Sequence, residues 1–220
     1  MEYEVSHSHR FGYELFQVKE SFQHRWSEID NAIHSLTDEE IVEGFRDQQM
    51  KSQVKGKSIS RIINGLLKAR FISLGWSHES RLFQDEAFGD AWALDFAKEN
   101  VSLEVGFNHG TDAAWNVLKL NLASELNHIE KQVQTDLGVV ITATPELKKA
   151  GGFDSAIGTS ETYKKILVAL QQVITVPIVI IGLRAPRKFA IVVNWHKNED
   201  GKRKGVGEVV WKTEELKFAD

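Results

Sequence analysis

The chain has 220 residues, of which 42% are hydrophobic, with a formal net charge of −4 at pH 7 and no cysteine. This length can bury the core of one α/β domain, and the hydrophobic content excludes a disordered chain. The lack of cysteine excludes disulfides and thiolate metal sites. No apolar run reaches the roughly 18 residues of a membrane-spanning helix, and the first ten residues lack a signal-peptide core. We therefore expect a single cytoplasmic domain over residues 1–220, with no membrane contact.

Residues 1–76 show mainly helical periodicity. Apolar residues recur at three- and four-residue steps from Leu15 to Leu36, which predicts one long helix. A second pattern predicts a helix over 58–74, and Gly75 is placed to end it. No linker follows, so we expect this helical part to pack onto an α/β core formed by residues 77–220.

The rest of the chain alternates strand and helix patterns. Strands are expected at 81–83, 92–96 and 101–107, followed by a helix from Thr111 or Asp112 with an apolar stripe at Trp115, Leu118, Leu122, Leu126, Ile129 and Val133. Continuous apolar runs at 137–143 and 176–183 suit interior strands, with a helix over 159–174 between them. This unit predicts a crossover within a mixed sheet, and later strands are expected at 189–193 and 207–211.

Positive charge is concentrated in segments, although the total charge is negative. No Asp or Glu occurs between Gln48 and His78, a stretch that contains Lys51, Lys55, Lys57, Arg61, Lys68 and Arg70. Two further groups are Arg184, Arg187 and Lys188, and then Lys197, Lys202, Arg203 and Lys204. The distribution of charge says more about a nucleic-acid partner than its sum does. Two interpretations stay open, a solvated surface or a contact with the phosphate backbone made by Lys55, Lys57 and Arg61.

The most informative segment runs from Ala91 to Phe107. If Glu99-Asn100 is the two-residue turn of a hairpin, Asp95 lies directly opposite Glu104. Opposed side chains share a face, with their Cβ atoms about 5 Å apart. Their neighbours on that face would be the small residues Ala93, Ala97, Ser102 and Gly106, which leave room for a phosphodiester. The other face would be apolar, with Trp92, Leu94, Phe96, Leu103, Val105 and Phe107.

Two opposed carboxylates repel each other, so something must offset their charges. A bound divalent cation would do so, and Mg²⁺ takes one or two carboxylates together with water and phosphate oxygens. A proton shared by Asp95 and Glu104 is another solution. The remaining alternative is a solvent-facing hairpin that carries two acids by chance.

These residues and their neighbours resemble the BglII/BstYI family of type II restriction endonucleases, within the PD-(D/E)xK superfamily. Asp95-Phe96, followed by Glu104-Val105-x-Phe107, is similar to the catalytic motif of that family. Other segments match in the same order, namely Gly75-Trp76-x-x-Glu79-Ser80-Arg81, Ser124-Glu125-Leu126, and Val176-Pro177 before Ile181-Gly182-Leu183. The resemblance extends from the N-terminus to about residue 185.

The resemblance implies a restriction-endonuclease-like α/β fold, a mixed β-sheet core flanked by helices with a helical N-terminal part. It implies a homodimer that cuts palindromic double-stranded DNA by Mg²⁺-dependent hydrolysis, with a cognate DNA methyltransferase in the same system. A palindrome that contains GATC is expected from known family sites. Asp95 and Glu104 would be metal ligands and catalytic residues. Asn64 falls near a family Asn that orders water at the site, and its alternative is a surface position on a helix.

The chain departs from the family at Gly106, where the family has Gln and the wider class often has Lys. We expect the free space to admit water or a side chain from elsewhere, such as Asn64 or His109. Candidate DNA contacts are Asn108, His109, Ser155, Thr159 and Ser160, the last three in a loop placed like the family's recognition loop. The alternatives are turn chemistry at His109 and helix capping at Thr159.

Other functions remain compatible with these residues. Gly106 suggests a catalytically weakened DNA-binding module, and a repair or nicking nuclease of the same superfamily would carry the same motif. A hydrolase of small phosphate esters is a more distant alternative. The acid-free basic stretch favours a polymeric anion over a small ester.

Overall fold

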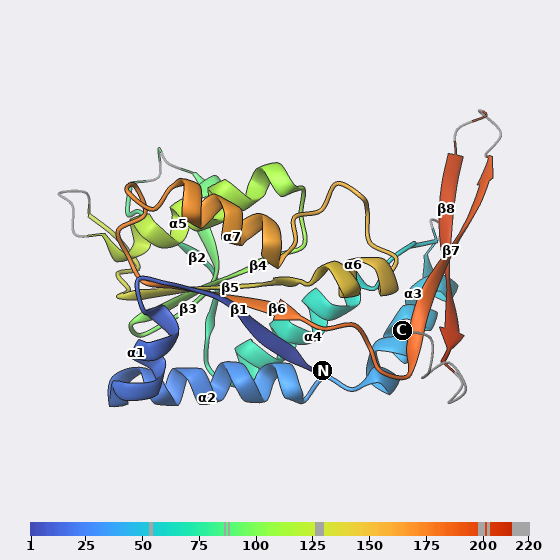
Figure 1. The fold of residues 1–220 in the computed structure, drawn as a ribbon, viewed down its shortest axis with the longest axis horizontal. Coiled ribbons are helices and arrows are strands. Elements are labelled where there is room, and N and C mark those ends of the chain that lie inside the picture. The colour runs from blue at the N-terminus through green and yellow to red at the C-terminus, as the bar shows by residue number, and fades with distance from the viewer. Residues whose placement is uncertain are drawn as a thin grey trace.

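The computed structural model describes residues 1–52, 55–85, 87, 89–125, 130–197, 201 and 203–212. Its centre is a six-stranded sheet in the order β1 (Tyr3–His9), β6 (Ile178–Leu183), β5 (Leu137–Ala143), β4 (Val101–Gly106), β3 (Ala93–Lys98) and β2 (Ser77–Arg81) (Figure 1). Strands β4, β5 and β6 are parallel, whereas β1 pairs antiparallel with β6, and β2, β3 and β4 pair antiparallel in turn. The prediction of an α/β fold with a mixed sheet is confirmed.

Helices cover both faces of this sheet. Helices α2 (Glu20–His34) and α4 (Ser60–Ser73) lie on one side, and α5 (Ala113–Ser124) and α7 (Ser160–Ala169) lie on the other (Figure 1). Along β5, Val139 and Ile141 join the apolar cluster of the first side, and Val140 joins that of the second. The strand is therefore apolar on both faces, which explains its continuous hydrophobic run.

The connection from β5 to the parallel strand β6 contains α6 (Pro145–Ala150) and α7. Thr144 caps α6 by accepting a hydrogen bond from the Leu147 N–H (3.2 Å), and Pro145 occupies the first turn. Thr159 is the N-cap of α7, and its own N–H donates to the Thr162 hydroxyl (3.1 Å). The predicted strand–helix–strand unit is confirmed, with two helices in place of one.

A separate two-stranded sheet follows β6 in the chain. It is formed by β7 (Phe189–Lys197) and β8 (Arg203–Trp211), and it stands beside α3 (Asp38–Lys51) at one end of the molecule (Figure 1). Both strands are longer than the sequence pattern predicted. Phe189 and Ile191 anchor the base of this ribbon in the main core, whereas Trp195 is 52% exposed.

The prediction of one long helix from Leu15 to Leu36 is wrong. Helix α1 (Gly12–Val18) ends at Lys19, which has extended dihedral angles, and α2 then begins at Glu20. The break lets the Phe16 and Phe22 rings pack edge to face at 5.9 Å and leaves Val18 77% exposed. The apolar spacing continues across the break, so periodicity alone could not reveal it.

Helix α5 is shorter than predicted and buries a different face. It ends at Ser124, and Leu126 and Ile129 of the predicted stripe lie outside the described residues. Its buried face carries Ala113, Asn116, Val117, Lys119, Leu120 and Ala123, whereas Trp115 of the predicted stripe is 37% exposed. This rotation brings polar side chains of α5 against the sheet.

Three elements were not predicted at all, namely β1, α3 and α6. Strand β2 begins at Ser77 and ends at Arg81, earlier than the expected strand at 81–83. The expected helix over 58–74 is present as α4, and Gly75 follows it with φ +81°, the left-handed conformation that glycine adopts easily. Among the described residues, no helix is long and apolar enough to cross a membrane.

Candidate active site

The β3–β4 hairpin forms in the predicted register. Phe96 pairs with Leu103, Ala97 with Ser102 and Lys98 with Val101. The turn is Glu99-Asn100, in which Glu99 has φ +50°. The strand pairing therefore places Asp95 directly opposite Glu104, one residue beyond the last pair of the ladder, Phe96 and Leu103.

At that step, hydrogen bonds from backbone N–H groups to the two carboxylates replace the backbone ladder. The Asp95 N–H donates to Glu104 Oε1 (3.3 Å), and the Val105 N–H donates to Asp95 Oδ2 (2.7 Å). Each carboxylate thus accepts a bond from the opposite strand, which holds both acids at the point where the strands part. Asp95 Oδ1 and Glu104 Oε2 make no hydrogen bond within the described part of the chain.

Asp95 faces a pocket of about 240 Å³ on the side of the sheet that α4 covers. The pocket is lined by Asn64, Gly65, Lys68, His78, Asp95, Phe96, Val105 and Asn108. The predicted division of the hairpin faces is correct for Phe96, Leu103, Val105 and Phe107, and wrong for Leu94 and Trp92, which pack in the opposite cluster. Glu79, opposite Asp95 on β2, has φ +51°, so the regular pleat is interrupted at this point.

Glu104 is almost fully buried, at 1% exposure, and its carboxylate meets a lysine from α5. Lys119 Nζ lies 2.7 Å from Glu104 Oε1 and also donates to the carbonyl oxygen of Ala93 (2.9 Å). Burial and the nearby charge of Asp95 raise the pKa of Glu104 to about 8, although the Lys119 ammonium acts in the opposite direction. The site therefore holds two mutually repelling acids with one cation behind them.

The space beside Gly106 is filled by Tyr163 of α7. A Cβ atom built on Gly106 would lie 2.0 Å from the Tyr163 hydroxyl oxygen, and that hydroxyl accepts a hydrogen bond from Asn116 Nδ2 (2.9 Å). A side chain from elsewhere therefore fills this space, as expected, but it is the buried Tyr163 and neither Asn64, His109 nor water. The positively charged group nearest the carboxylates is Lys119, which comes from another element.

The structure brings together several of the predicted site residues. Asn64 and Asn108 line the pocket with Asp95. The segment after β4 is bonded to the candidate recognition loop, because Gly110 N–H donates to Ala156 O (2.8 Å) and Gly158 N–H donates to Asn108 O (3.1 Å). Exposed His109 and Ser155 therefore lie in neighbouring segments at the same edge of the site.

Thr159 and Ser160 do not belong to that exposed edge. Their exposures are 8% and 1%, and Thr159 caps α7. Because both side chains are enclosed by protein, we do not propose them as DNA contacts.

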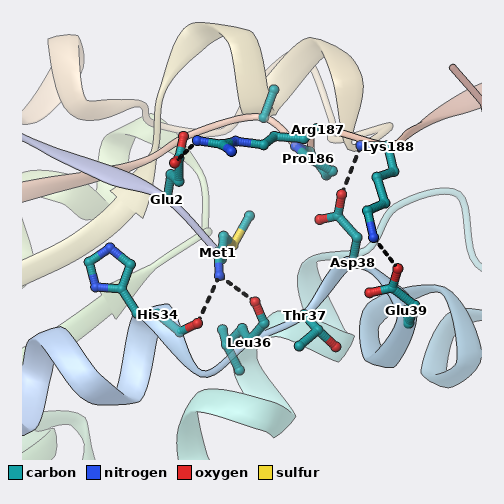
Figure 2. Close-up of a pocket in the computed structure, with 11 residues that line it drawn as sticks. Met1, Glu2, His34, Leu36, Thr37, Asp38, Glu39, Pro186, Arg187 and Lys188 are labelled. Atoms are coloured by element: carbon teal, nitrogen blue, oxygen red, sulfur yellow. Dashed lines mark hydrogen bonds and ion pairs between the residues drawn. The ribbon is translucent and has the colours of Figure 1, made fainter. Parts of the chain in front are cut away.

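Several basic residues are paired with acids. Arg184, Arg187 and Lys188 form ion pairs with Glu4, Glu2 and Glu39, and Figure 2 shows the last two around the pocket beside Met1. In the first basic stretch, Lys51, Lys57 and Arg70 pair with Asp47, Asp154 and Glu40. Lys55, Arg61 and Lys68 make no ion pair with another described residue, so their charges remain available to a partner.

Comparison with known protein families gives a match, which covers the chain from β1 to the end of β6. A model of the family "Restriction endonuclease BglII/BglIII" matches residues 4–183. The chain belongs to this restriction endonuclease family. Membership makes it a type II site-specific deoxyribonuclease, with DNA as its substrate. No curated protein matches the chain by sequence.

Solved structures of BglII share the fold of this family member. The crystal structure of BglII bound to a DNA 16-mer has a TM-score of 0.63 and 15% sequence identity, over 96% of this chain and 100% of that chain. The crystal structure of free BglII has a TM-score of 0.53 and 14% identity, with the same coverage. At such identities the likeness establishes the fold and does not transfer residue roles.

Sequence reasoning missed three polar side chains of this candidate site, Asn116 and Lys119 of α5 and Tyr163 of α7. A signal was present for the first two, since they occur three residues apart within a mainly apolar helical segment. Helical residues at that spacing share a face, so a buried face through Val117 and Leu120 would have carried both toward the sheet.

Proposed function

We propose that this family member hydrolyses double-stranded DNA in a Mg²⁺-dependent reaction at a short palindromic site. The observation that carries the proposal is the pair of carboxylates Asp95 and Glu104. Each accepts a hydrogen bond from the opposite strand of the β3–β4 hairpin, where the backbone ladder ends, and Asp95 lines an open pocket. Asp95 and Glu104 are the proposed catalytic carboxylates, and Asn64 is proposed to hold water or a phosphate oxygen across the pocket.

The carboxylates fit a divalent cation. Mg²⁺ takes one or two carboxylates and completes its shell with phosphate and water oxygens, so a pair of acids beside an open pocket suits it. Asp95 Oδ1 and Glu104 Oε2 are the oxygens proposed to hold it. When bound, such a cation supplies Lewis-acid stabilisation of charge on the phosphate and activates water for attack.

The remaining polar residues position this pair and the substrate. Lys119 fixes the Glu104 carboxylate from behind, which leaves one of its oxygens directed away from the lysine. Tyr163, bonded to Asn116, excludes water from the space beside Gly106. Asn108, His109 and Ser155 are proposed to read base edges, since Asn suits the N6 and N7 atoms of adenine.

A two-fold DNA site is read most simply by a two-fold protein, so we propose a homodimer in the cytoplasm. A GATC-containing palindrome remains the leading candidate for the site, from the family resemblance. An endonuclease of this kind needs protection of its own genome, so a cognate DNA methyltransferase is the proposed partner in a restriction-modification system.

Digestion of unmethylated phage DNA tests the function as a whole. Purified protein is incubated with Mg²⁺ or Mn²⁺, and the fragment ends are sequenced. The proposal predicts 5′-phosphate ends at one palindromic sequence, cut symmetrically in both strands. Cuts in one strand only would favour a nicking or repair nuclease. Specific binding without breaks in either metal would favour a weakened DNA-binding module, the alternative that Gly106 suggests.

Apparent metal affinity should rise with pH. Glu104, with its pKa near 8, must lose a proton to hold a cation, so the affinity is expected to increase by up to about tenfold per pH unit below pH 8 and to level off above it. The Mg²⁺ concentration for half-maximal cleavage, measured from pH 6 to pH 9, checks this. Lys119→Met removes the cation that favours ionisation and should move the midpoint to higher pH. A requirement for Mg²⁺ that stays flat over this range would contradict a titration of Glu104 that is coupled to metal binding.

The exposed face of α4 should contact phosphates. Arg61, Asn64 and Lys68 are spaced three and four residues apart, so they share the face that leads into the pocket. Arg61→Gln and Lys68→Gln are each expected to reduce the slope of log K against log salt by about 0.9. Arg70→Gln is the matched control, because Arg70 is bound by both carboxylate oxygens of Glu40 (2.6 and 2.8 Å). Equal slopes for all three variants would assign Arg61 and Lys68 to a solvated surface.

A further inference from the structure

One face of the β7–β8 ribbon carries an exposed cluster of an aromatic ring and cations. The Trp195 ring contacts two cations, Lys57 Nζ at 5.5 Å from its centroid and the Arg203 guanidinium at 5.2 Å. Gly205 faces Trp195 across the ladder, where a Cβ atom would approach the ring to 3.2 Å. Lys197 pairs with Arg203 in the same register, so it lies on this face as well.

The cluster borders a groove that is rich in lysine. The groove has a volume of about 520 Å³ and lies between the ribbon and the candidate recognition loop, with Lys57, Lys148, Lys149, Ser155 and Trp195 among its lining residues. Its one lining acid is Asp154, which Lys57 already neutralises at 2.6 Å. The remaining charge of the groove is positive and favours an anionic partner.

The groove is linked along the chain to the helix beside the proposed active site, because Lys57 lines the groove and α4 begins at Ser60. Lys57 stands just before α4, whose exposed face leads through Arg61 to Asn64 and Lys68. At 1.5 Å per residue, the helix carries these side chains over about 10 Å from Arg61 to Lys68. One DNA strand carries a charge every 3.4 Å along the axis, so the row spans about three phosphates.

We propose that the Trp195 face of the β7–β8 ribbon is an arm that binds the DNA phosphate backbone beside the cleavage site. The inference rests on the proposed function and extends its DNA-contacting surface to residues beyond 183, where the family match ends. Lys197 and Arg203 supply the charges, and Trp195 holds the Arg203 guanidinium in place. The contact is with phosphates, so it carries no base preference.

The test is a salt titration of DNA binding in the presence of Ca²⁺ with protein that carries Asp95→Asn. Adding Lys197→Gln and Arg203→Gln should reduce the slope of log K against log salt by up to about 1.8 and weaken binding equally for all sequences. The matched control is Arg187→Gln with Lys188→Gln, which removes the same charge from residues that are paired with Glu2 and Glu39. Its slope should equal that of the parent.

The proposed DNA-binding role of the ribbon would be overturned if the Lys197 and Arg203 variant kept both the parent slope of log K against log salt and the parent midpoint of thermal unfolding. A halved mass of that variant in sedimentation would also overturn it, because the ribbon would then join two copies of the chain. Neither result bears on the proposed role of Asp95 and Glu104. That role would fail if the unmodified protein did not cleave DNA. A reduced slope together with an unchanged mass supports the arm.

Discussion

Asp95→Asn is expected to lower the single-turnover rate of DNA cleavage by at least about 100-fold to 1,000-fold, the effect typical of removing one group that stabilises transition-state charge. The amide keeps the shape of the side chain and can still accept the hydrogen bond from the Val105 N–H. What it loses is the negative charge that holds a cation. DNA affinity measured in Ca²⁺ by fluorescence anisotropy should therefore stay close to that of the unmodified protein.

Glu104→Gln should have a comparable effect on the rate, with an additional loss of stability. Above pH 8, where Glu104 is ionised, the substitution leaves the Lys119 ammonium buried at 7% exposure without its charged partner, and an uncompensated buried charge is strongly destabilising. Adding Lys119→Met should restore stability without restoring cleavage. This combination separates the chemical role of Glu104 from its structural role.

Asp136→Asn is the control for both substitutions. Asp136 is an exposed acid near the turn end of the hairpin, where its N–H donates to Asn100 O (2.8 Å). Its replacement should leave the cleavage rate unchanged. If Asp95→Asn cut DNA as fast as Asp136→Asn, the assignment of the carboxylates would be wrong.

Gly106→Gln should destabilise the protein, although it places the family residue at this position. The new Cβ would lie 2.0 Å from the Tyr163 hydroxyl oxygen, and Tyr163 is 2% exposed with its hydroxyl bonded to Asn116. Overpacking of a filled core costs about 1–3 kcal/mol of unfolding free energy, or more where the backbone cannot shift. Urea denaturation measures this loss directly, and cleavage should fall with it.

Tyr163→Ala provides the companion variant. If the clash with Tyr163 is the cause, the Gly106→Gln/Tyr163→Ala pair should lose less stability than the sum of its parts, by about 0.5–3 kcal/mol. Gly65→Ala is the control for glycine replacement, since a Cβ there meets nothing within 4 Å and alanine suits a helix better. A Gly106→Gln protein that is as stable as the parent and cuts faster would contradict this account.

The local sequence pattern was enough to predict the interior strands of the sheet and the register of the β3–β4 hairpin. Strands buried on both faces carry apolar runs, and a two-residue turn fixes the register once the strands are known. Strand β1 was missed because it is an edge strand with polar residues such as His7, and it is specified by pairing with β6, whose residues lie 169 to 180 positions away in the chain. The break at Lys19 was missed because the apolar spacing continues through it.

The carboxylates could be found from sequence because they lie nine residues apart on paired strands. Lys119 and Tyr163 could not, since they reach the same point from α5 and α7 by tertiary packing. Helix α5 has two apolar stripes, one through Trp115 and Leu118 and one through Val117 and Leu120. The sheet selects the second, and periodicity alone does not distinguish them.

The central claim is that Asp95 and Glu104 carry a metal-dependent cleavage of double-stranded DNA. One measurement tests it most directly, namely digestion of an unmethylated supercoiled plasmid by the unmodified protein and by Asp95→Asn, each with Mg²⁺ and with EDTA. The account predicts linear DNA from the unmodified protein with Mg²⁺ and uncut plasmid in the other three reactions. Linear DNA from Asp95→Asn, or from the unmodified protein in EDTA, would contradict it.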